Sequence, residues 1–219
     1  KTYVPGLEEK TTVVLTGIAQ EHKLVSVPKH PYSDTPYFFY LSAIYWYKNH
    51  INLIEGYRLA YKDEHNLPEL LIAGFPLDKE YQTKFEKKIM DDQLSDKVKY
   101  LGALTAKAIP AFLHHAVINF FPSTCETNSV VQSEILGMHG VMACSNQPPM
   151  SEIPGDAAVT FDPSYPSSIA ECMIKVFNDN DLQNRLRKRA EIRSEQLSWD
   201  ECGKVIWESA ARAYQIYNY

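Results

Sequence analysis

The chain has 219 residues, of which 45% are hydrophobic and 22% charged, with a formal net charge of −5 at pH 7. This composition is that of an ordinary folded protein with a substantial core, so disorder along the whole chain is excluded. The acidic balance argues against a surface for duplex nucleic acid, and no nucleic-acid partner is expected. A few placed dipoles and cations would still suffice to bind a phosphate.

The four cysteines form no C-x-x-C pair and match no zinc-ligand spacing; they are Cys125, Cys144, Cys172 and Cys202. We therefore expect buried, reduced thiols in a cytoplasmic protein. The longest apolar run, at residues 38–47, is too short to span a bilayer, and the start of the chain has no signal-peptide pattern. Because the sequence begins at Lys1 rather than at a methionine, we expect a fragment of a longer protein.

The predicted elements alternate regularly after an irregular lead-in that ends at Pro36 and contains a β-branched run at residues 11–15. Short continuous apolar runs indicate buried strands, and apolar residues three and four apart indicate helices. In chain order we predict a strand at 37–43, a helix at 49–65, a strand at 69–73, a helix at 79–90, a strand at 98–101, a helix at 109–116, a strand at 117–121, a helix at 129–138, strands at 140–144 and 158–161, a helix at 166–178, a helix capped by Asp181, and a helix after Ser198.

Apolar strands that alternate with helices are typical of a parallel sheet covered on both faces. The predicted fold class is therefore α/β, a doubly wound parallel sheet of the Rossmann type. We divide the chain into a lead-in at 1–36, a Rossmann-like domain at 37–197 and a C-terminal helix at 198–219. Ligands of such sheets bind beyond the carboxyl ends of the strands. The loops that could form a site follow Ala43, Gly74, Gly102, Phe121 and Cys144.

The loop after Phe121 carries the strongest indication of a ligand site. It leads into a helix, and the first backbone amides of a helix have no partner within it. Those of Asn128, Ser129 and Val130 are in this position. Together with the helix dipole, they form a candidate site for an anion such as a phosphate.

Two glutamates, Glu126 and Glu134, lie on either side of this candidate anion site. From the helical rise, Glu134 is about 8 Å further along the helix, which is the reach from a diphosphate to the ribose of the same nucleotide. A carboxylate there could accept from the ribose hydroxyls. The alternative is that two glutamates fall at this spacing by chance, with Glu126 only favouring the helix dipole. Glu134 is harder to explain in that way, because it interrupts an apolar helix face and a buried unpaired carboxylate is unfavourable.

The neighbouring segments, taken in order, resemble glycosyltransferase family 4. The matching segments are Thr11 to Ile18, similar to a crossover strand ending in Asn-Gly-Ile; Lys48-Asn49; Leu71 to Gly74; Tyr100 to Gly102; Phe120-Phe121-Pro122-Ser123; Glu126-x7-Glu134; Gly140 to Ser145; Ser151-Glu152; Gly155-Asp156-Ala157; Phe161-Asp162-Pro163; and Ser198-Trp199. The order of these matches along nearly the whole chain is more specific than any one of them.

This resemblance implies one half of a GT-B architecture, namely the C-terminal domain that binds the nucleotide-sugar donor. It implies that Glu126 holds hydroxyls of the donor sugar, that Glu134 holds the ribose, and that Lys48 neutralises the departing diphosphate. The backbone of Asn128, Ser129 and Val130 would contact the phosphate and sugar. Three further residues, Gly74, Gly102 and Leu104, would border the base. Neither a metal nor another cofactor is implied.

Two departures from the family pattern bear on this site. An arginine that usually precedes the lysine by five or six positions, and shares the diphosphate with it, is replaced here by Ala43 and Ser42. Lysine alone cannot reproduce the bidentate phosphate contact of a guanidinium. The family's Phe-Gly after the first glutamate is replaced by Asn128-Ser129, which alters the expected sugar pocket.

The favoured hypothesis is a retaining glycosyltransferase that moves a sugar from a UDP-, GDP- or ADP-sugar to an acceptor hydroxyl. Its missing N-terminal domain would hold the acceptor, so this chain alone should bind donor weakly and catalyse little. The alternatives are a nucleotide-sugar epimerase of the same fold and a non-catalytic nucleotide-binding or scaffold domain.

The resemblance also implies cytoplasmic polysaccharide or glycolipid synthesis, with a peripheral contact of the full enzyme at the inner membrane surface. The basic residues from Arg185 to Arg193 are a candidate contact for anionic head groups. A solvated helix face is the ordinary alternative for such a run.

Overall fold

The computed structural model describes residues 11–18, 27, 29–91 and 94–217, and in this part of the chain six parallel strands form a sheet. The strands are β1 (Tyr37–Leu41), β2 (Glu69–Ala73), β3 (Val98–Tyr100), β4 (Ile118–Phe121), β5 (Met142–Ser145) and β6 (Ala158–Phe161). The α-helices are α1 (His50–Asp63), α2 (Lys79–Asp91), α3 (Ile109–His115), α4 (Val130–Gly137), α5 (Pro166–Phe177), α6 (Asn180–Gln196) and α7 (Trp199–Tyr217). Two short 3-10 helices are η3 (Trp46–Lys48) and η4 (Gly155–Ala157).

The strand order is β3-β2-β1-β4-β5-β6, so the direction of winding reverses between β1 and β4. These two central strands pair in register, with Phe38 opposite Ile118 and Phe39 opposite Asn119. Ligands of doubly wound sheets bind at this switch point, where the loops after the two central strands diverge. The predicted α/β fold class is confirmed, and its topology brings the segments that contain Lys48 and Glu126 to neighbouring positions.

The core is built on β1, whose five residues are all buried. The ring of Phe38 meets those of Tyr57 in α1, Phe120 in β4 and Phe177 in α5, each edge-on. Such T-shaped contacts are the favoured geometry of aromatic pairs. A strand covered on both faces needs apolar residues at every position, which explains why its sequence shows no alternation.

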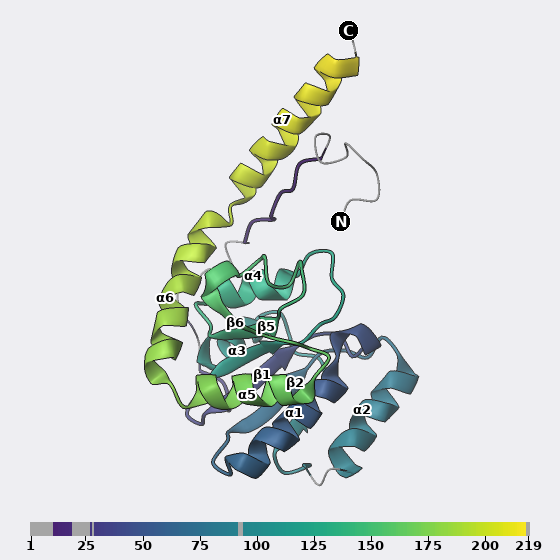
Figure 1. Ribbon diagram of the computed structural model, residues 1–219, viewed down its shortest axis with the longest axis vertical. Coiled ribbons are helices and arrows are strands. Elements are labelled where there is room, and N and C mark those ends of the chain that lie inside the picture. The colour runs from purple at the N-terminus through teal and green to yellow at the C-terminus, as the bar shows by residue number, and fades with distance from the viewer. Residues whose placement is uncertain (1–10, 19–26, 28, 92–93, 218–219) are drawn as a thin grey trace.

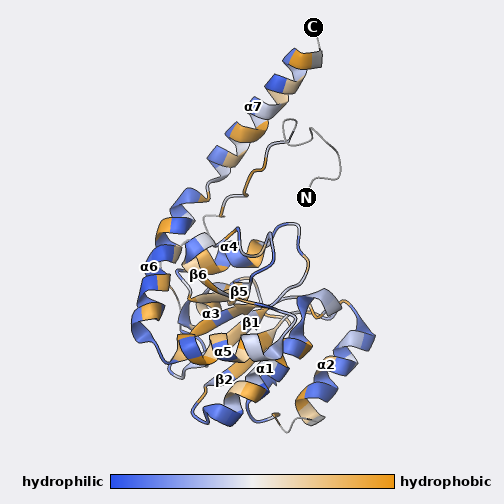
Figure 2. Ribbon diagram, viewed as in Figure 1, coloured by the Kyte–Doolittle hydropathy of each residue, from blue (hydrophilic) through white to orange (hydrophobic). Residues whose placement is uncertain are grey.

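Helices cover both faces of the sheet. Figure 1 shows α1, α2 and α5 on one side and α4 on the other. The contacts agree, because α1 packs against α5, and α4 packs against α6. In Figure 2 the hydrophobic strands lie inside, while the helices turn many hydrophilic residues outward. Within the described residues, no helix is both long enough and apolar enough to cross a membrane.

The chain between β1 and α1 differs from the prediction of a strand reaching Ala43 and a helix starting at Asn49. The strand ends at Leu41, and the 3-10 helix η3 comes before α1. Asn49 separates the two helices with φ 61° and ψ 33°, in the left-handed region. An αR residue there would continue the chain as one helix, so this conformation sets the turn after Lys48.

The predicted start of α6 was wrong. The helix begins at Asn180 rather than after Asp181, because Asp179 is the N-cap and its Oδ1 accepts from the amide of Leu182 at 2.7 Å. The basic run is largely a solvated face, with Arg185, Lys188 and Arg189 exposed. Arg187 is the exception, since it donates to the carbonyls of His114, Ala116 and His139. Burial lowers the pKa of Arg187 from its ordinary value.

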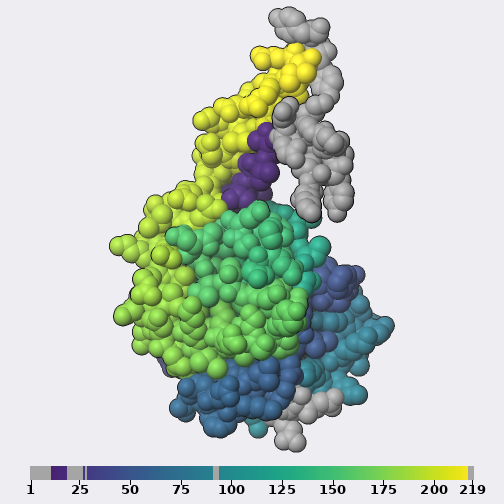
Figure 3. Space-filling view, in the orientation of Figure 1, coloured from purple at the N-terminus to yellow at the C-terminus, as the bar shows by residue number. Residues whose placement is uncertain are grey.

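The last helix, α7, extends away from the sheet, and residues 11–18 lie alongside its base (Figures 1 and 3). The Ser198 hydroxyl accepts from the amides of Asp200 and Glu201, as the capping pattern predicted. Residues 11–18 pair with no strand in the described structure, contrary to the expected crossover strand. They are held instead beside the α6–α7 junction, where the amide of Ile18 donates to the carbonyl of Leu197 at 3.1 Å. The domain boundary at 197 and 198 stays a prediction.

Candidate active site

The carboxyl ends of the strands bring together a lysine and a glutamate that are 78 residues apart in sequence. Nζ of Lys48 lies 2.5 Å from Oε1 of Glu126, and the two side chains are only 15% and 10% exposed. The ammonium also lies 5.1 Å from the centre of the Tyr47 ring. An ion pair with so little solvent around it interacts more strongly than one on an open surface. The predicted sugar-binding carboxylate and the predicted diphosphate-binding lysine are therefore in direct contact.

Hydrogen bonds from β1 and from the loop after β4 hold the backbone around Lys48 in place. The Tyr40 hydroxyl donates to the carbonyl of Lys48 at 2.6 Å. The amide of Thr124 donates to the carbonyl of Tyr47 at 2.9 Å, two residues before Glu126. The side-chain amide of Asn49 donates to the carbonyl of Pro122 at 3.2 Å. Hydrogen bonds thus connect the backbone segment that contains Lys48 directly to the loop that contains Glu126.

The position of the missing arginine is filled by a buried hydroxyl. Ser42 is only 6% exposed, and its Oγ lies 3.0 Å from Nε2 of the fully buried His50. Burial, and then the charge of Lys48, lowers the pKa of His50 to about 3, so this ring is neutral at pH 7. Ala43 is half-buried. Neither residue replaces the charge of a guanidinium.

The first turn of α4 follows the Glu126 loop. Ser129 is the N-cap, and its hydroxyl accepts from the amide of Gln132 at 3.3 Å. Within the described part of the chain, no side chain or carbonyl accepts a hydrogen bond from the amides of Asn128, Ser129 or Val130. Backbone donors without a protein partner at the start of a helix are what an anion site requires.

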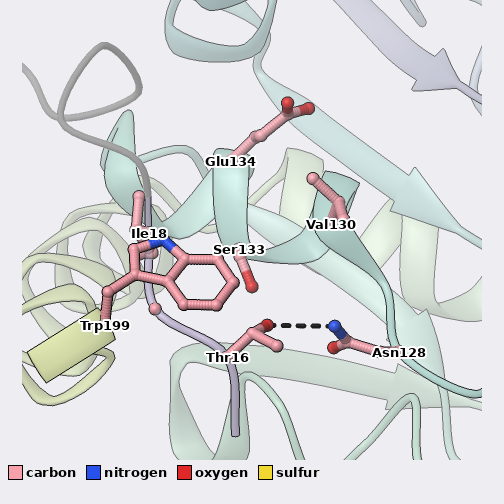
Figure 4. Close-up of a pocket in the computed structure, with 8 residues that line it drawn as sticks. Thr16, Ile18, Asn128, Val130, Ser133, Glu134 and Trp199 are labelled. Carbon is pink, nitrogen blue, oxygen red and sulfur yellow. Dashed lines mark hydrogen bonds between the residues drawn. The ribbon is translucent and has the colours of Figure 1, made fainter. Parts of the chain in front are cut away.

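A pocket of about 130 Å³ opens beside the same helix. Its lining residues are Thr16, Gly17, Ile18, Asn128, Val130, Ser133, Glu134 and Trp199. Figure 4 shows Trp199 and residues 16–18 on one side of the pocket and α4 on the other, with the Asn128 amide joined to the Thr16 hydroxyl. That hydrogen bond measures 3.0 Å. Three of the predicted donor-site residues, namely Asn128, Val130 and Glu134, are thus gathered around one pocket.

The contribution of Thr16, Gly17 and Trp199 to this pocket was missed from the sequence. Gly17 lies directly against the start of α7, because a Cβ added to it would be 2.2 Å from the backbone nitrogen of Trp199. In the sequence, the Thr-Gly pair and the Ser-Trp pair are separate matches to the family pattern. Nothing local in either segment shows that they meet.

The residues predicted to border the base form a separate group at the ends of β2 and β3. The amide of Gly74 donates to the carbonyl of Gly102 at 2.9 Å, and the Tyr100 hydroxyl donates to the carbonyl of Gly74 at 2.8 Å. Leu104 is half-buried against the core. None of these residues lines the Glu134 pocket. Their role at the base stays a prediction.

No group of three or more His, Cys, Asp or Glu side chains in the described residues is arranged to hold a metal ion. The cysteines are free thiols; Cys144, Cys172 and Cys202 are buried, but Cys125 is exposed, contrary to the expectation that all are buried. Cys125 lies in the loop between β4 and α4, next to Glu126, rather than in a strand or helix that packs into the core.

Known proteins resemble this chain in fold and sequence. The O-antigen chain mannosyltransferase B of Escherichia coli is 21% identical over 168 residues, which are 76% of this chain and 43% of that protein. A sucrose-phosphate synthase from Thermosynechococcus elongatus superposes with a TM-score of 0.72 and 15% identity, over 92% of this chain and 50% of its own. The HepE protein of Anabaena, solved with UDP and glucose, has a TM-score of 0.70 and 17% identity, over 80% of this chain and 48% of its own.

The chain therefore spans half or less of the length of these relatives. The structural similarities, at less than 20% identity, establish the shared fold. The sequence establishes more, because the family model described as glycosyl transferases group 1 matches residues 25–193, more than half of the chain. The chain belongs to the glycosyl transferases group 1 family.

Proposed function

We propose that this chain is the donor-binding half of a retaining glycosyltransferase of family 4. The observation that carries the proposal is the shielded Lys48–Glu126 pair beside the free amides at the start of α4. A lysine with little solvent around it is suited to the charge that develops on a departing diphosphate. A carboxylate next to it can accept hydrogen bonds from sugar hydroxyls. Sugar and diphosphate would then meet where the two side chains meet.

In the proposed reaction, the bond between C1 of the sugar and the diphosphate oxygen breaks, and C1 bonds to the acceptor oxygen. The diphosphate leaves with the bonding electrons, and the proton of the acceptor hydroxyl passes to an oxygen of that departing diphosphate. Lys48 and the amides of Asn128, Ser129 and Val130 stabilise that charge, while Glu126 orients the sugar. The proposed reaction includes no metal, as the resemblance to the family implies.

The pocket beside Glu134 is proposed to take the ribose. Its volume of about 130 Å³ is small beside the 300–1,000 Å³ that is usual for sites of drug-sized ligands. It can hold one ring of a nucleotide-sugar but not the whole molecule. The Lys48–Glu126 position would take the sugar and diphosphate, and the ends of β2 and β3 the base. The UDP in the Anabaena HepE structure supports a nucleoside diphosphate as the ligand class.

The acceptor would be held by a domain outside this chain, because the chain spans only 43% of the E. coli relative. That relative is named for transfer of mannose to O-antigen chains. A role in polysaccharide synthesis is proposed on this similarity. Closing two domains over the donor would also exclude water from the reacting sugar.

The test is a calorimetric titration of this chain with UDP, GDP and ADP. One of them should bind saturably, and Glu134→Gln should weaken that binding about tenfold or more, because hydrogen bonds to a charged acceptor are the stronger kind. Lys48→Gln should weaken binding of the diphosphate more than that of the matching nucleoside. The control is Glu171→Gln, which removes the same charge from an exposed site on α5. Absence of saturable binding by all three at millimolar concentration would contradict the proposal.

A second candidate, a nucleotide-binding scaffold without turnover, is favoured by the uncharged Ser42 and Ala43. The full-length protein distinguishes the two. Hydrolysis or transfer of the sugar from the nucleotide that binds best would exclude the scaffold. Binding without turnover, followed by turnover in Ala43→Arg, would identify the missing guanidinium as the cause.

A further inference from the structure

Asn49 occupies an unusual place between η3 and α1. Its φ of 61° lies in the left-handed region, which glycine enters without steric cost and which asparagine tolerates better than most residues. Glycine would therefore satisfy the backbone. Asparagine adds a side-chain amide, and this amide is fully used. Nδ2 donates to the carbonyl of Pro122 at 3.2 Å and to that of Pro163 at 2.8 Å.

These two carbonyls belong to loops that lie far apart in sequence. Pro122 opens the loop after β4 that carries Glu126, and Pro163 lies in the loop between β6 and α5. Asn49 itself directly follows Lys48 in the loop after β1. One side chain thus joins three loops at the carboxyl edge of the sheet. Asn52, on the first turn of α1, donates to the Pro163 carbonyl as well, at 3.0 Å, but makes no bond to the Glu126 loop.

We infer that Asn49 is a positioning residue, whose side chain sets Lys48 against Glu126 for the donor diphosphate. This inference rests on the proposed function of that pair. The Lys48 ammonium lies 2.5 Å from Glu126 at the end of a long, flexible side chain, and a fixed backbone on both sides narrows the positions that the two charged groups can take relative to each other. Displacement of a catalytic group by 1 Å is enough to lose much of its effect. Asn49 fixes both sides at once, since it adjoins one partner and bonds to the loop of the other.

The test compares Asn49→Gly with Asn52→Ala. Asn49→Gly keeps the left-handed backbone and removes both hydrogen bonds, whereas Asn52→Ala removes one hydrogen bond to the same Pro163 carbonyl. We expect Asn49→Gly to weaken binding of the preferred nucleoside diphosphate about fivefold, and Asn52→Ala less than about twofold. Asn49→Asp is the second variant, because it keeps the shape but cannot donate. Thermal melts show which variants remain folded.

A double-mutant cycle separates positioning from a general structural role. If Asn49 acts through Lys48, Asn49→Gly should have no effect on affinity in a Lys48→Gln background. An equal loss in both backgrounds would overturn the inference. So would wild-type affinity in both Asn49 variants.

A measurement without ligand keeps the inference separate from the proposed function. The Thr124 amide, which donates to the carbonyl of Tyr47 across the same junction, should exchange its hydrogen about fivefold faster in Asn49→Gly and unchanged in Asn52→Ala. If the wild-type chain bound no nucleotide, the proposed function would fail, and Thr124 exchange would still decide whether Asn49 joins the loops. Unchanged exchange in Asn49→Gly would overturn the inference whether or not a nucleotide binds.

Discussion

The two parts of the candidate active site are held in place differently. The Lys48 half, meaning Lys48 and Glu126 with the loops beneath them, is built from segments that leave the sheet and is closed by hydrogen bonds between them. The Glu134 half, meaning Glu134 and its pocket, has one wall on α4. Its other wall comes from residues 16–18 and Trp199, which lie outside the sheet.

This difference shows which part of the site depends only on the fold of the domain. The Lys48 half should form whenever the sheet forms, because its hydrogen bonds join the segments that follow the neighbouring strands β1 and β4. The Glu134 half also requires that the lead-in and α7 keep their places. Local opening is easiest in segments with few hydrogen bonds to the rest of the structure, so the two halves should respond differently to the same kind of change.

The largest effect is expected from Gly74→Ala, at the contact between the ends of β1 and β2 in the sheet on which the Lys48 half depends. Gly74 has φ 149°, and a Cβ there would be 1.7 Å from the carbonyl oxygen of Ser42. Because that oxygen belongs to the backbone at the end of β1, the two strand ends must separate. Urea unfolding should show a loss of at least about 3 kcal/mol. Gly102→Ala is the control, since its φ is 70° but nothing lies within 4 Å, and only about 1 kcal/mol of backbone strain is expected. Equal losses in both variants would show that the close contact is relieved without strain.

A smaller effect is expected from acid, through the buried His50. Its pKa falls from 6.5 to about 3 on folding, so the unfolded chain binds the proton more readily. The stability that neutral His50 contributes is therefore complete above pH 6.5 and is lost as the pH falls toward 3. The slope should approach about 1.4 kcal/mol per pH unit at the acid end, which amounts to about 1.6 kcal/mol between pH 6.5 and 5.

Urea unfolding at pH 7, 6 and 5 measures how the free energy of unfolding changes with pH. In His50→Gln this slope should be smaller by the contribution of about one proton. The remaining slope has the same sign, because burial also lowers the pKa values of His30, His115 and His139. The measurement stops at pH 5 because the pKa of Glu55 is lowered to about 2, so its contribution is lost only below pH 4.5. An unchanged slope in His50→Gln would show that this ring is not the group that titrates.

The smallest effect on stability is expected from Gly17→Ala, in the Glu134 half. The added Cβ would meet the backbone nitrogen of Trp199 at 2.2 Å, so residues 16–18 must move away from α7. Unfolding free energy should change by less than about 1 kcal/mol, because this segment is not part of the sheet. Nucleotide affinity should nevertheless fall about threefold as the pocket widens. A loss of stability as large as that of Gly74→Ala would contradict the distinction between the two halves.

Much of the sheet could be predicted from the sequence. The bounds of β2 and β6 agree with the prediction, because each is a short apolar run with a clear local end. The predicted start of α6 was wrong because Asp179 and Asp181 are both residues of a type that suits an N-cap. Only the observed bond from the Leu182 amide identifies the residue that acts. Local chemistry thus predicts that a helix begins, but not at which of two similar residues.

The site itself depended on contacts that no local pattern contains. Lys48 and Glu126 meet because β1 and β4 are neighbours, and this was anticipated only through the resemblance to a known family. Asn49 carried a usable signal, since asparagine is among the residues that tolerate a left-handed conformation. Its two carbonyl partners lie 73 and 114 residues away, beyond any sequence pattern. The same holds for Gly17 and Trp199.

The exposed thiol next to Glu126 has a practical consequence. Burial raises the pKa values of the Cys144 and Cys172 thiols to about 12, and Cys202 is also buried, so Cys125 is the accessible thiol among the four. Thiol-directed dyes react with accessible thiolates. A fluorophore attached under mild conditions would therefore sit at one defined position, one residue from the carboxylate proposed to hold the sugar. The unaltered chain thus offers its own attachment point for an optical reporter of ligand occupancy, with no cysteine to add or remove.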